Sequence, residues 1–399
     1  MDKENMEKQI VLYGTSWCPD CKRSKQFFGE QRIPYAYVDI EHDSEAMAFV
    51  EKTNRGNRSI PTIVFPDGSV LVEPSNAQLA EKLGLQTRAK RSFYDAAIIG
   101  GGPTGLTAAI YLAREGLDAL IIEKAGLGGQ ARITQVLDNF PGFDEGVSGA
   151  DFAARLTRQA QRFGAEILQA QDVVSVDRDG QYLCVRTADG SEYGAKAALL
   201  ATGARYRRLG IPGEDDLIGV NVHFCATCDG AFYKGKKVLV VGGGNSGFEE
   251  GLFLTKFASR VDIVEFLSQV KASKILQEKV AEKDNMSVTI NHAVKELRIK
   301  NGKLDAVIAE DRATGERKEW QYDGVFVFIG FSPNSDLAKG KADVDQWGAI
   351  LTDKTLMTSV PGLFAAGDVR AGSTKQAAAA AGEGATAALM MRQYLQENG

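Results

Sequence analysis

Two pairs of cysteines carry the clearest chemistry in the sequence. Cys18 and Cys21 lie in WCPDC, and Cys225 and Cys228 lie in CATCDG. A Cys-x-x-Cys pair can alternate between a dithiol and a disulfide, or it can supply two thiolate ligands to zinc. Roughly 200 residues separate the two pairs, far more than the ligand spacing of a zinc ribbon. The sequence therefore favours two redox centres and no metal site.

Length and charge limit the classes of protein to which these cysteines can belong. The 399 residues are enough for two or three domains, and the net charge of −5 with no basic stripe argues against a nucleic-acid partner. No apolar run is long enough to cross a membrane, and the first residues, MDKEN, do not resemble a secretory signal. We therefore expect no membrane association and a cytoplasmic location, where thiols are kept reduced.

The elements around the first cysteine pair follow the order β-α-β-α-β-β-α. The expected ranges are strand 9–13, a helix entered at Cys18, strand 35–40, helix 44–53, strand 61–65, a further short strand, and a helix from Ser75 with a capping box to Gln78. This pattern is typical of a thioredoxin-like fold. A thiolate at a helix N-terminus is stabilised by unpaired N–H groups, so we predict that Cys18 is the nucleophile and Cys21 the resolving thiol.

Residues 9–85 resemble a glutaredoxin, and NRSIPTIVFPDGSVLVEPS is similar to mycoredoxins. The resemblance implies a cis proline at Pro61, which would help to hold an extended disulfide substrate. The segment with which many glutaredoxins hold glutathione is replaced by Leu71-Val72-Glu73-Pro74-Ser75. We take 1–85 as this domain and 86–94 as a linker that would let it swing or serve a neighbouring subunit.

Two glycine-rich turns follow further along the chain, in DAAIIGGGPTG (95–105) and KVLVVGGGNSG (237–247). Each joins an apolar strand to a helix, and each is followed 23 residues beyond its first glycine by an acidic residue at the end of the next strand, Glu123 or Glu265. Such turns also occur for structural reasons alone. In this context they predict two dinucleotide sites, in which the turn approaches a pyrophosphate and the acid binds ribose hydroxyls.

A nicotinamide delivers a hydride, whereas a disulfide accepts electrons at sulfur, so a flavin is needed between them. Residues 93–399 resemble low-molecular-weight thioredoxin reductases and the flavoprotein component of alkyl hydroperoxide reductase. The matching motifs are GGGPTG, GLGGQ, DNFPGF, ATGA, CATCDG, GGGNSGFEE and LFAAGDVR. The resemblance implies an α/β fold in which a thioredoxin-like domain precedes a two-domain, Rossmann-type disulfide reductase. FAD would bind to 95–206 and 331–399, NAD(P) to 207–330, and the chain would form a homodimer.

The resemblance also implies roles for individual residues. Cys228 would approach the flavin, Cys225 would be the interchange thiol, Asp229 would exchange a proton with the departing thiolate, and Glu249 would bind the nicotinamide amide. Asp229 could instead cap a helix, and Glu249 could be a solvated charge. The residues implied to bind FAD are Gly100, Gly102, Gly105, Glu123, Gln130, Asn139, Asp368 and Gln376, and those implied to bind the nicotinamide nucleotide include Gly242, Gly244, Gly247 and Glu265.

The strand end at Glu265 bears on the choice of nucleotide. Thioredoxin reductases that use NADPH carry His-Arg-Arg-x-x-x-Arg there, whereas this chain has EFLSQVK at 265–271. A carboxylate accepts a hydrogen bond from a 2′-hydroxyl and repels a 2′-phosphate, so the sequence favours NADH over NADPH. Lys271 and Arg260 are the cations that could still support a phosphate.

Together these features predict a relay from NADH through FAD to Cys225–Cys228, then to Cys18–Cys21, and on to a protein disulfide such as that of a thioredoxin or a peroxiredoxin. Three alternatives stay open. They are an NADH oxidase in which the thiols only protect or regulate, a reductase of low-molecular-weight disulfides, and a redox-sensing binding module.

Overall fold

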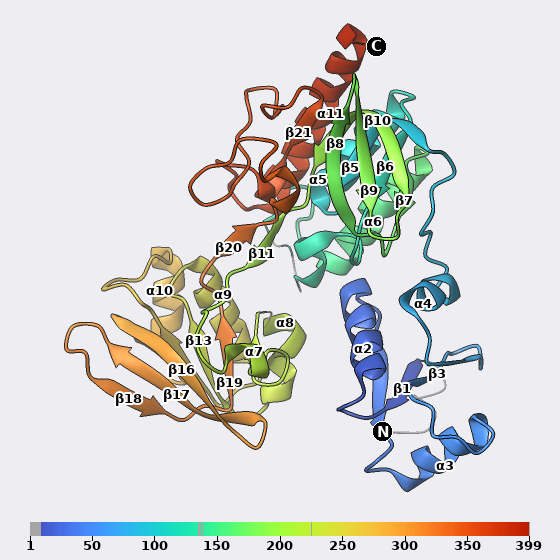
Figure 1. Cartoon of the computed structure of the whole chain (residues 1–399). Helices are drawn as coiled ribbons and strands as arrows, with labels where there is room; N and C mark the ends of the chain where they lie inside the picture. The colour runs from blue at the N-terminus through green and yellow to red at the C-terminus, as the bar shows by residue number, and fades with distance from the viewer. Residues whose placement is uncertain (1–8, 135–136, 138, 225, 399) are drawn as a thin grey trace.

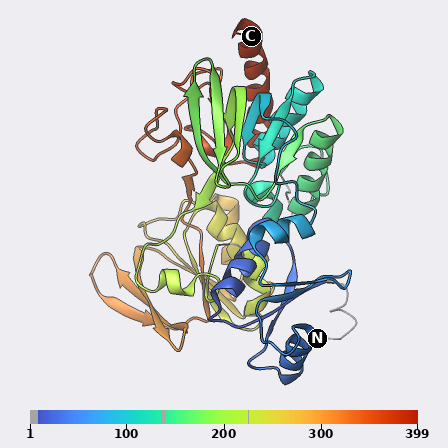
Figure 2. The same ribbon diagram turned by 45° about the vertical axis from the view of Figure 1, so that its right-hand side comes forward.

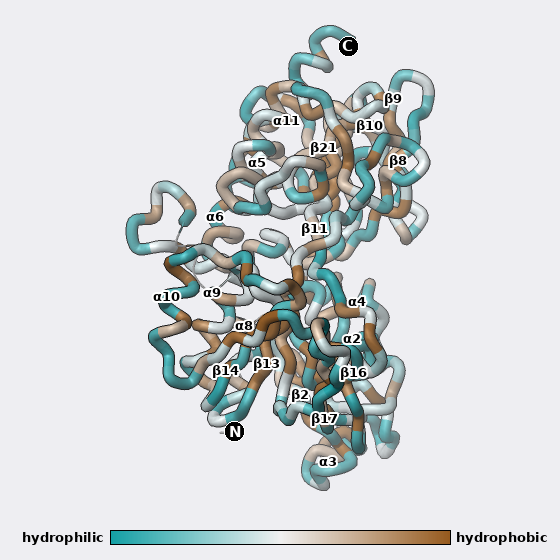
Figure 3. Tube along the Cα trace, turned by 90° about the vertical axis from the view of Figure 1, so that its left-hand side faces the viewer, coloured by the Kyte–Doolittle hydropathy of each residue, from teal (hydrophilic) through white to brown (hydrophobic). Residues whose placement is uncertain are grey.

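The computed structural model describes residues 9–134, 137, 139–224 and 226–398, except for the side chains of Ile133, Thr227 and Cys228. Its sheets fall into three units (Figure 1). In Figures 1 and 2 the N-terminal unit (blue) and the middle unit (yellow to orange) lie below the unit that carries the largest sheet. Figure 3 shows hydrophobic segments along central strands such as β13, as expected for strands buried on both faces.

The N-terminal unit has a four-stranded sheet in the order β2-β1-β3-β4, in which β1 is parallel to β2 and antiparallel to β3. Its elements are β1 (Ile10–Gly14), α2 (Pro19–Gln31), β2 (Tyr35–Asp39), α3 (Ser44–Thr53), β3 (Thr62–Val64), β4 (Val70–Val72) and α4 (Asn76–Lys82). This is the predicted order. Ser75 and Gln78 form the reciprocal capping box at the start of α4 that the sequence predicted.

The largest sheet is built from two separated parts of the chain. Its order is β7-β6-β5-β10-β9-β8, and β21 pairs with β10 in parallel. The strands are β5 (Phe93–Ile99), β6 (Ala119–Ile122), β7 (Glu166–Leu168), β8 (Val173–Asp179), β9 (Tyr182–Thr187), β10 (Glu192–Leu200) and β21 (Leu363–Ala365). The helices are α5 (Pro103–Arg114), η1 (Gly129–Ile133), α6 (Gly149–Arg162), η3 (Asp336–Ala338), η4 (Gly367–Val369) and α11 (Ala377–Asn398). Helices α5 and α11 pack closely, since a Cβ on Gly384 would lie 2.3 Å from the Thr104 carbonyl oxygen.

The middle unit has a parallel sheet in the order β12-β19-β13-β14-β15 and a three-stranded antiparallel sheet, β16-β17-β18. The strands are β12 (Val222–His223), β13 (Lys237–Val241), β14 (Arg260–Val264), β15 (Met286–Thr289), β16 (His292–Lys300), β17 (Lys303–Asp311), β18 (Arg317–Trp320) and β19 (Gly324–Val327). The helices are α7 (Glu214–Leu217), α8 (Ala226–Asp229), η2 (Gly230–Tyr233), α9 (Asn245–Leu254) and α10 (Lys274–Ala281). Two antiparallel strands, β11 (Ala204–Tyr206) and β20 (Phe331–Pro333), join this unit to the largest sheet.

The segment expected to be a linker lies against the protein along part of its length. Strand β5 already begins at Phe93, so it takes up the last two residues of the expected linker. The Lys90 amide donates to Glu166 Oε1 at 2.8 Å, and Arg91 forms an ion pair with Asp118. Side-chain partners this distant in sequence cannot be identified from a polar composition, which is why the segment was expected to swing freely.

In the ranges that the structure describes, no helix combines the length and the hydrophobicity needed to cross a membrane.

Candidate functional site

The first cysteine pair lies at the start of α2, where the sequence placed it. Cys18 is the N-cap residue: its backbone is extended, and its sulfur accepts a hydrogen bond from the Cys21 amide at 3.1 Å. Pro19 occupies the first position of the helix, which lacks an intrahelical N–H partner in any case. The Cys18 sulfur therefore lies at the positive end of the helix dipole, where an N–H group already donates to it.

The two sulfurs of this pair differ in their surroundings. Cys21 is fully buried, and burial together with its hydrogen bond to Cys18 raises the pKa of its thiol to about 12. Cys18 is also buried, at 5% exposure, but it lies next to Trp17, which is 63% exposed, and its sulfur is 3.7 Å from the Ile60 carbonyl oxygen. The Ile60–Pro61 peptide is cis, as the resemblance implied. The arrangement suits attack by Cys18 and later resolution by Cys21.

The residues expected to hold FAD come together around one cavity of about 370 Å³. It lies at the carboxyl ends of β5 and β6, where open α/β sheets bind ligands. The Asn139 side-chain amide donates to Gln376 Oε1 at 3.0 Å, although 237 residues separate the two in sequence. Of the predicted FAD residues, those that line the cavity are Gly100, Gly102, Glu123, Gln130, Asn139, Asp368 and Gln376. Burial raises the pKa of Asp368, whose Oδ1 accepts a hydrogen bond from the Ser373 hydroxyl at 3.1 Å.

The first glycine-rich turn fits a bound pyrophosphate. Gly100 has a φ of 109°, and a Cβ there would lie 2.3 Å from the Ala201 carbonyl oxygen. A Cβ on Gly105 would lie 1.9 Å from the Gly100 carbonyl oxygen, so this glycine is needed for helix–strand packing. A Cβ on Gly102 would have its nearest protein neighbour 4.0 Å away and would project into the space that a cofactor would fill. The three glycines therefore have three different physical roles.

Glu123 fixes the shape of this turn. Its Oε2 accepts a hydrogen bond from the Gly101 amide at 2.6 Å, and its Oε1 accepts one from the Ala125 amide at 2.7 Å. Burial raises the pKa of this carboxyl group. Each carboxylate oxygen can accept more than one hydrogen bond, so Glu123 can also bind a ribose hydroxyl, the role that the resemblance implied.

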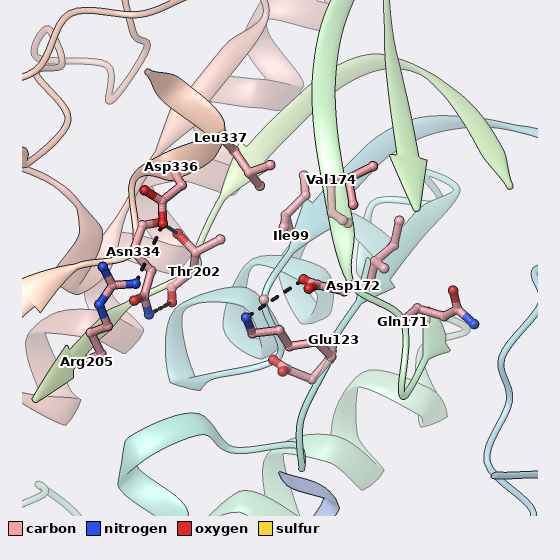
Figure 4. A pocket seen from close by; sticks show the side chains of 14 residues that line it. Ile99, Glu123, Gln171, Asp172, Val174, Thr202, Arg205, Asn334, Asp336 and Leu337 are labelled. Atoms are coloured by element: carbon pink, nitrogen blue, oxygen red, sulfur yellow. Dashed lines mark hydrogen bonds and ion pairs between the residues drawn. The ribbon is translucent and has the colours of Figure 1, made fainter. Parts of the chain in front are cut away.

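A second cavity, of about 400 Å³, adjoins the first at Glu123 (Figure 4). The two cavities share Gly100, Glu123, Lys124, Thr202 and Asn334. Two ion pairs line the second cavity: Arg205 faces Asp336 at 3.6 Å, and Lys124 faces Asp172 at 3.8 Å. Because Gly100 of the first glycine-rich turn lines both cavities, we treat the second cavity as part of the same site.

The second glycine-rich turn repeats the geometry of the first. Gly242 has a φ of 126°, a Cβ on Gly247 would lie 1.9 Å from the Gly242 carbonyl oxygen, and a Cβ on Gly244 would meet nothing within 4 Å. Glu265 accepts hydrogen bonds from the Gly243 amide at 2.5 Å and from the Leu267 amide at 2.7 Å. This turn also fits a dinucleotide.

Of the two cations that the sequence suggested, Lys271 lies at this turn, since its amide donates to the Gly243 carbonyl oxygen at 2.8 Å, whereas Arg260 does not. Arg260 begins β14 and lies about 16 Å along the strand from Glu265, and it is paired with Asp262 at 2.7 Å. It is therefore not available to a 2′-phosphate at Glu265. Arg312, which the sequence did not single out, stacks on Phe266 with its guanidinium carbon 3.7 Å from the ring centroid. It reaches this strand end from β17, a contact that spacing along the chain does not reveal.

The second cysteine pair is only partly described. Cys225 lies outside the described residues, and for Cys228 the structure gives the backbone, within α8, but not the side chain. Asp229 ends this helix, and its carboxylate makes no capping hydrogen bond at the start of η2. Instead, Asp229 Oδ2 lies 3.2 Å from His223 Nδ1, and the other ring nitrogen of His223 lies 2.7 Å from the Tyr233 hydroxyl. His223, to which the sequence analysis assigned no role, thus orients the Asp229 side chain at the end of α8.

Two neighbouring glutamates on α9, Glu249 and Glu250, differ in their exposure to solvent. Glu249, the predicted partner of the nicotinamide amide, is exposed. Glu250 accepts a hydrogen bond from the Ala226 amide at the start of α8, and burial raises its pKa to about 7. Its Oε2 is buried and has no hydrogen-bond partner in the part of the chain that the structure describes. A buried oxygen atom without a partner can accept a hydrogen bond from an amide group, so Glu250 is a second candidate for binding the nicotinamide amide. The two adjacent glutamates in GFEE are the sequence signal that could have suggested it.

Comparisons with known proteins agree with this geometry. Residues 94–384 match the family model "Pyridine nucleotide-disulphide oxidoreductase", and residues 10–70 match the model "Glutaredoxin". A thioredoxin reductase of Bacillus subtilis is 41% identical over 308 residues, which cover 77% of this chain and 96% of that protein. A thioredoxin reductase of Peptoclostridium acidaminophilum is 40% identical over 311 residues, which cover 76% and 98%.

Solved structures give the same result. The thioredoxin reductase of Lactococcus lactis superposes with a TM-score of 0.73 at 34% identity, covering 76% of this chain and 99% of that one. The thioredoxin reductase of T. acidophilum has a TM-score of 0.71 at 32% identity, with the same coverage. The chain therefore belongs to the pyridine nucleotide-disulphide oxidoreductase family, as a flavoprotein disulfide reductase of the thioredoxin reductase type that uses FAD and NAD(P)H and carries an N-terminal glutaredoxin domain.

Proposed function

We propose that this enzyme passes electrons from NADH through FAD to Cys225–Cys228, then to Cys18–Cys21, and finally to a protein disulfide in the cytoplasm. The observation that carries the proposal is the placement of Cys18 at the N-cap of α2 with Cys21 buried behind it, in a domain joined to a thioredoxin reductase. We assign residues 1–85 to the glutaredoxin-like domain, 86–94 to the linker, 95–206 and 331–399 to the FAD domain, and 207–330 to the NAD(P) domain. A homodimer is part of the proposal.

The chemistry at sulfur consists of two successive thiol–disulfide exchanges. When bound, FAD would take a hydride from the nicotinamide and supply two electrons to the Cys225–Cys228 disulfide. The Cys225 thiolate then attacks the Cys18–Cys21 disulfide and forms a mixed disulfide, which Cys228 resolves, so that Cys18 and Cys21 leave reduced. Asp229, oriented by His223, holds the proton that a departing thiolate takes up. The Cys18 thiolate repeats the attack on the substrate disulfide, and Cys21 resolves it.

We propose that a domain moves to bring the two cysteine pairs into contact. The C-terminal end of α2 contacts the FAD domain: the Gly126 amide donates to the Glu30 carbonyl oxygen at 2.8 Å. Cys18 lies at the opposite end of this 13-residue helix, about 20 Å away. Because thiol exchange needs sulfur–sulfur contact, we propose that the glutaredoxin domain undocks or that the NAD(P) domain turns toward it during the cycle.

An anaerobic titration with NADH tests this relay. We expect the wild-type chain to take up three two-electron equivalents, one for the flavin and one for each cysteine pair, and the Cys18→Ser variant to take up two. A Cys225→Ser variant separates the relay from an NADH oxidase, because oxidase activity would survive that change while reduction of disulfides would not. Uptake of three equivalents by Cys18→Ser, or unchanged disulfide reduction by Cys225→Ser, would contradict the relay.

We expect kcat/KM for NADH to exceed that for NADPH by about tenfold or more, because a carboxylate beside a 2′-phosphate costs several kcal/mol unless a cation offsets it. Arg312 is the cation that lies closest to this strand end through its stacking on Phe266. The Arg312→Ala variant should therefore lose NADPH activity further and keep its kcat/KM for NADH within about twofold. Steady-state kinetics with both nucleotides measure this, and a wild-type preference for NADPH would show the assignment to be wrong.

A further inference from the structure

The glutaredoxin domain contributes a side chain to the FAD cavity. Arg32 follows α2 as its C-cap, with a left-handed backbone (φ 56°, ψ 41°), and its amide donates to the carbonyl oxygens of Phe28 and Gly29. Arg32 lines the cavity together with Glu123 and the glycines of the first turn. Among the lining residues, all within the described part of the chain, it alone comes from this domain.

The backbone around Arg32 is held close to the FAD domain. The Gln31 side-chain amide donates to the Lys124 carbonyl oxygen at 2.6 Å, and the Gly126 amide donates to the Glu30 carbonyl oxygen at 2.8 Å. A Cβ on Gly126 would lie 3.0 Å from the Gln31 carbonyl oxygen, so the loop at 124–126 approaches α2 as closely as a glycine permits. The end of α2 is thereby fixed at the mouth of the cavity.

The charged side chains around Arg32 favour the binding of an anion. Burial and the nearby Arg132 lower the pKa of Arg32, and its Nε is buried without a hydrogen-bond partner among the residues that the structure describes. Arg132 Nη1 lies 3.3 Å from the position that a Cβ on Gly126 would take. Of the carboxylates in the described residues, Glu123 lies near Arg32, and it already accepts hydrogen bonds from two backbone amides. Arg32 thus brings a guanidinium group to the cavity, and the guanidinium group of Arg132 lies beside Gly126, which also lines it.

We propose that Arg32 binds the pyrophosphate of FAD, so that the docked glutaredoxin domain forms part of the cofactor site. The inference rests on FAD binding in this cavity and does not depend on the thiol relay. A guanidinium that gains a phosphate oxygen partner makes a charge-assisted hydrogen bond, and the buried donor is satisfied. The same contact contributes to FAD binding and to docking of the glutaredoxin domain, so the two are coupled. Bound FAD stabilises the docked domain, and undocking of the domain lowers the affinity for FAD.

The dissociation constant of FAD tests the proposal without any measurement of activity. The Arg32→Gly variant keeps the left-handed backbone at no steric cost and removes the guanidinium. Arg55→Gly is the matched control, because Arg55 also has a φ of 56° and is exposed in the same domain. We expect Arg32→Gly to raise the dissociation constant of FAD about ten- to hundredfold, and Arg55→Gly to leave it within twofold of wild type. Ultrafiltration and the fluorescence of released flavin measure both.

The outcomes separate this inference from the proposed function. Equal retention of FAD by Arg32→Gly and Arg55→Gly would overturn the role of Arg32 and leave the flavoprotein intact, whereas a wild-type chain that binds no FAD would overturn the proposed function itself. If Arg32→Gly does not fold, Arg32→Lys against Arg55→Lys decides the question, because a lysine keeps the charge but loses the forked donor. A weaker hold on FAD in Arg32→Lys alone supports the proposal, and no difference refutes it.

Discussion

Replacing Cys18 by serine is expected to lower the reduction of protein disulfides about 10³-fold or more, because it removes the nucleophile and with it the covalent route. The reduction of bound flavin by NADH should be unchanged, since Cys18 lies at the end of α2 opposite to the contact with the FAD domain. Stopped-flow reduction of the flavin and steady-state turnover with an oxidised thioredoxin measure the two steps separately.

The partner variant, Cys21→Ser, should behave differently. Cys21 is fully buried and its pKa is raised to about 12, so it cannot be the first to attack an external disulfide. With Cys18 intact, the first attack still occurs, and a mixed disulfide with the substrate accumulates because no thiol resolves it. Non-reducing electrophoresis detects this adduct.

Cys184→Ser is the control for both variants, because Cys184 is a half-buried free thiol on β9, away from the first cysteine pair. Adduct formation by Cys18→Ser rather than Cys21→Ser would reverse the assignment of the two thiols. Normal turnover by Cys18→Ser would remove the glutaredoxin domain from the route of electrons.

Local features of the fold could be predicted from the sequence because their causes are local. The capping box between Ser75 and Gln78 needs residues three positions apart, and the structure confirms it. Helix α3 occupies Ser44–Thr53, the range that spacing predicted. The glycine-rich turns and the acids that follow them are likewise short-range patterns, and the structure places each acid against its own turn.

Contacts between the units could not be predicted, because they depend on how surfaces far apart in sequence meet. Nothing in the composition of α2 indicates that Gln31 reaches Lys124 or that Arg32 enters the FAD cavity. The pairing of His223 with Asp229 depends on the turn between β12 and α8, and it is visible only once that turn is formed. A single sequence shows which residues can do chemistry, and the fold decides which of them meet.

The Gly102→Val and Gly244→Val variants are each expected to lose binding at one nucleotide site and to keep it at the other. A Cβ at either position meets little or no protein within 4 Å, so neither change creates a clash within the fold. Both would place methyl groups where a pyrophosphate must approach the backbone. Gly102→Val should therefore yield a folded chain without flavin, whereas Gly244→Val should keep its flavin and lose reduction by NADH by about 10²-fold or more, since several kcal/mol of binding energy are removed.

A third variant distinguishes the loss of a ligand from the loss of the fold. Gly105→Ala is the contrasting variant, because its Cβ would lie 1.9 Å from the Gly100 carbonyl oxygen and must disturb the packing of α5 against β5. Flavin absorbance after purification, reduction of the flavin by dithionite and by NADH, and the midpoint of thermal unfolding are compared for the three variants. Flavin retained in Gly102→Val, or rapid reduction by NADH in Gly244→Val, would show that the nucleotide at that turn does not bind through the backbone. The opposite pattern, flavin lost from Gly244→Val alone, would exchange the two sites between the domains.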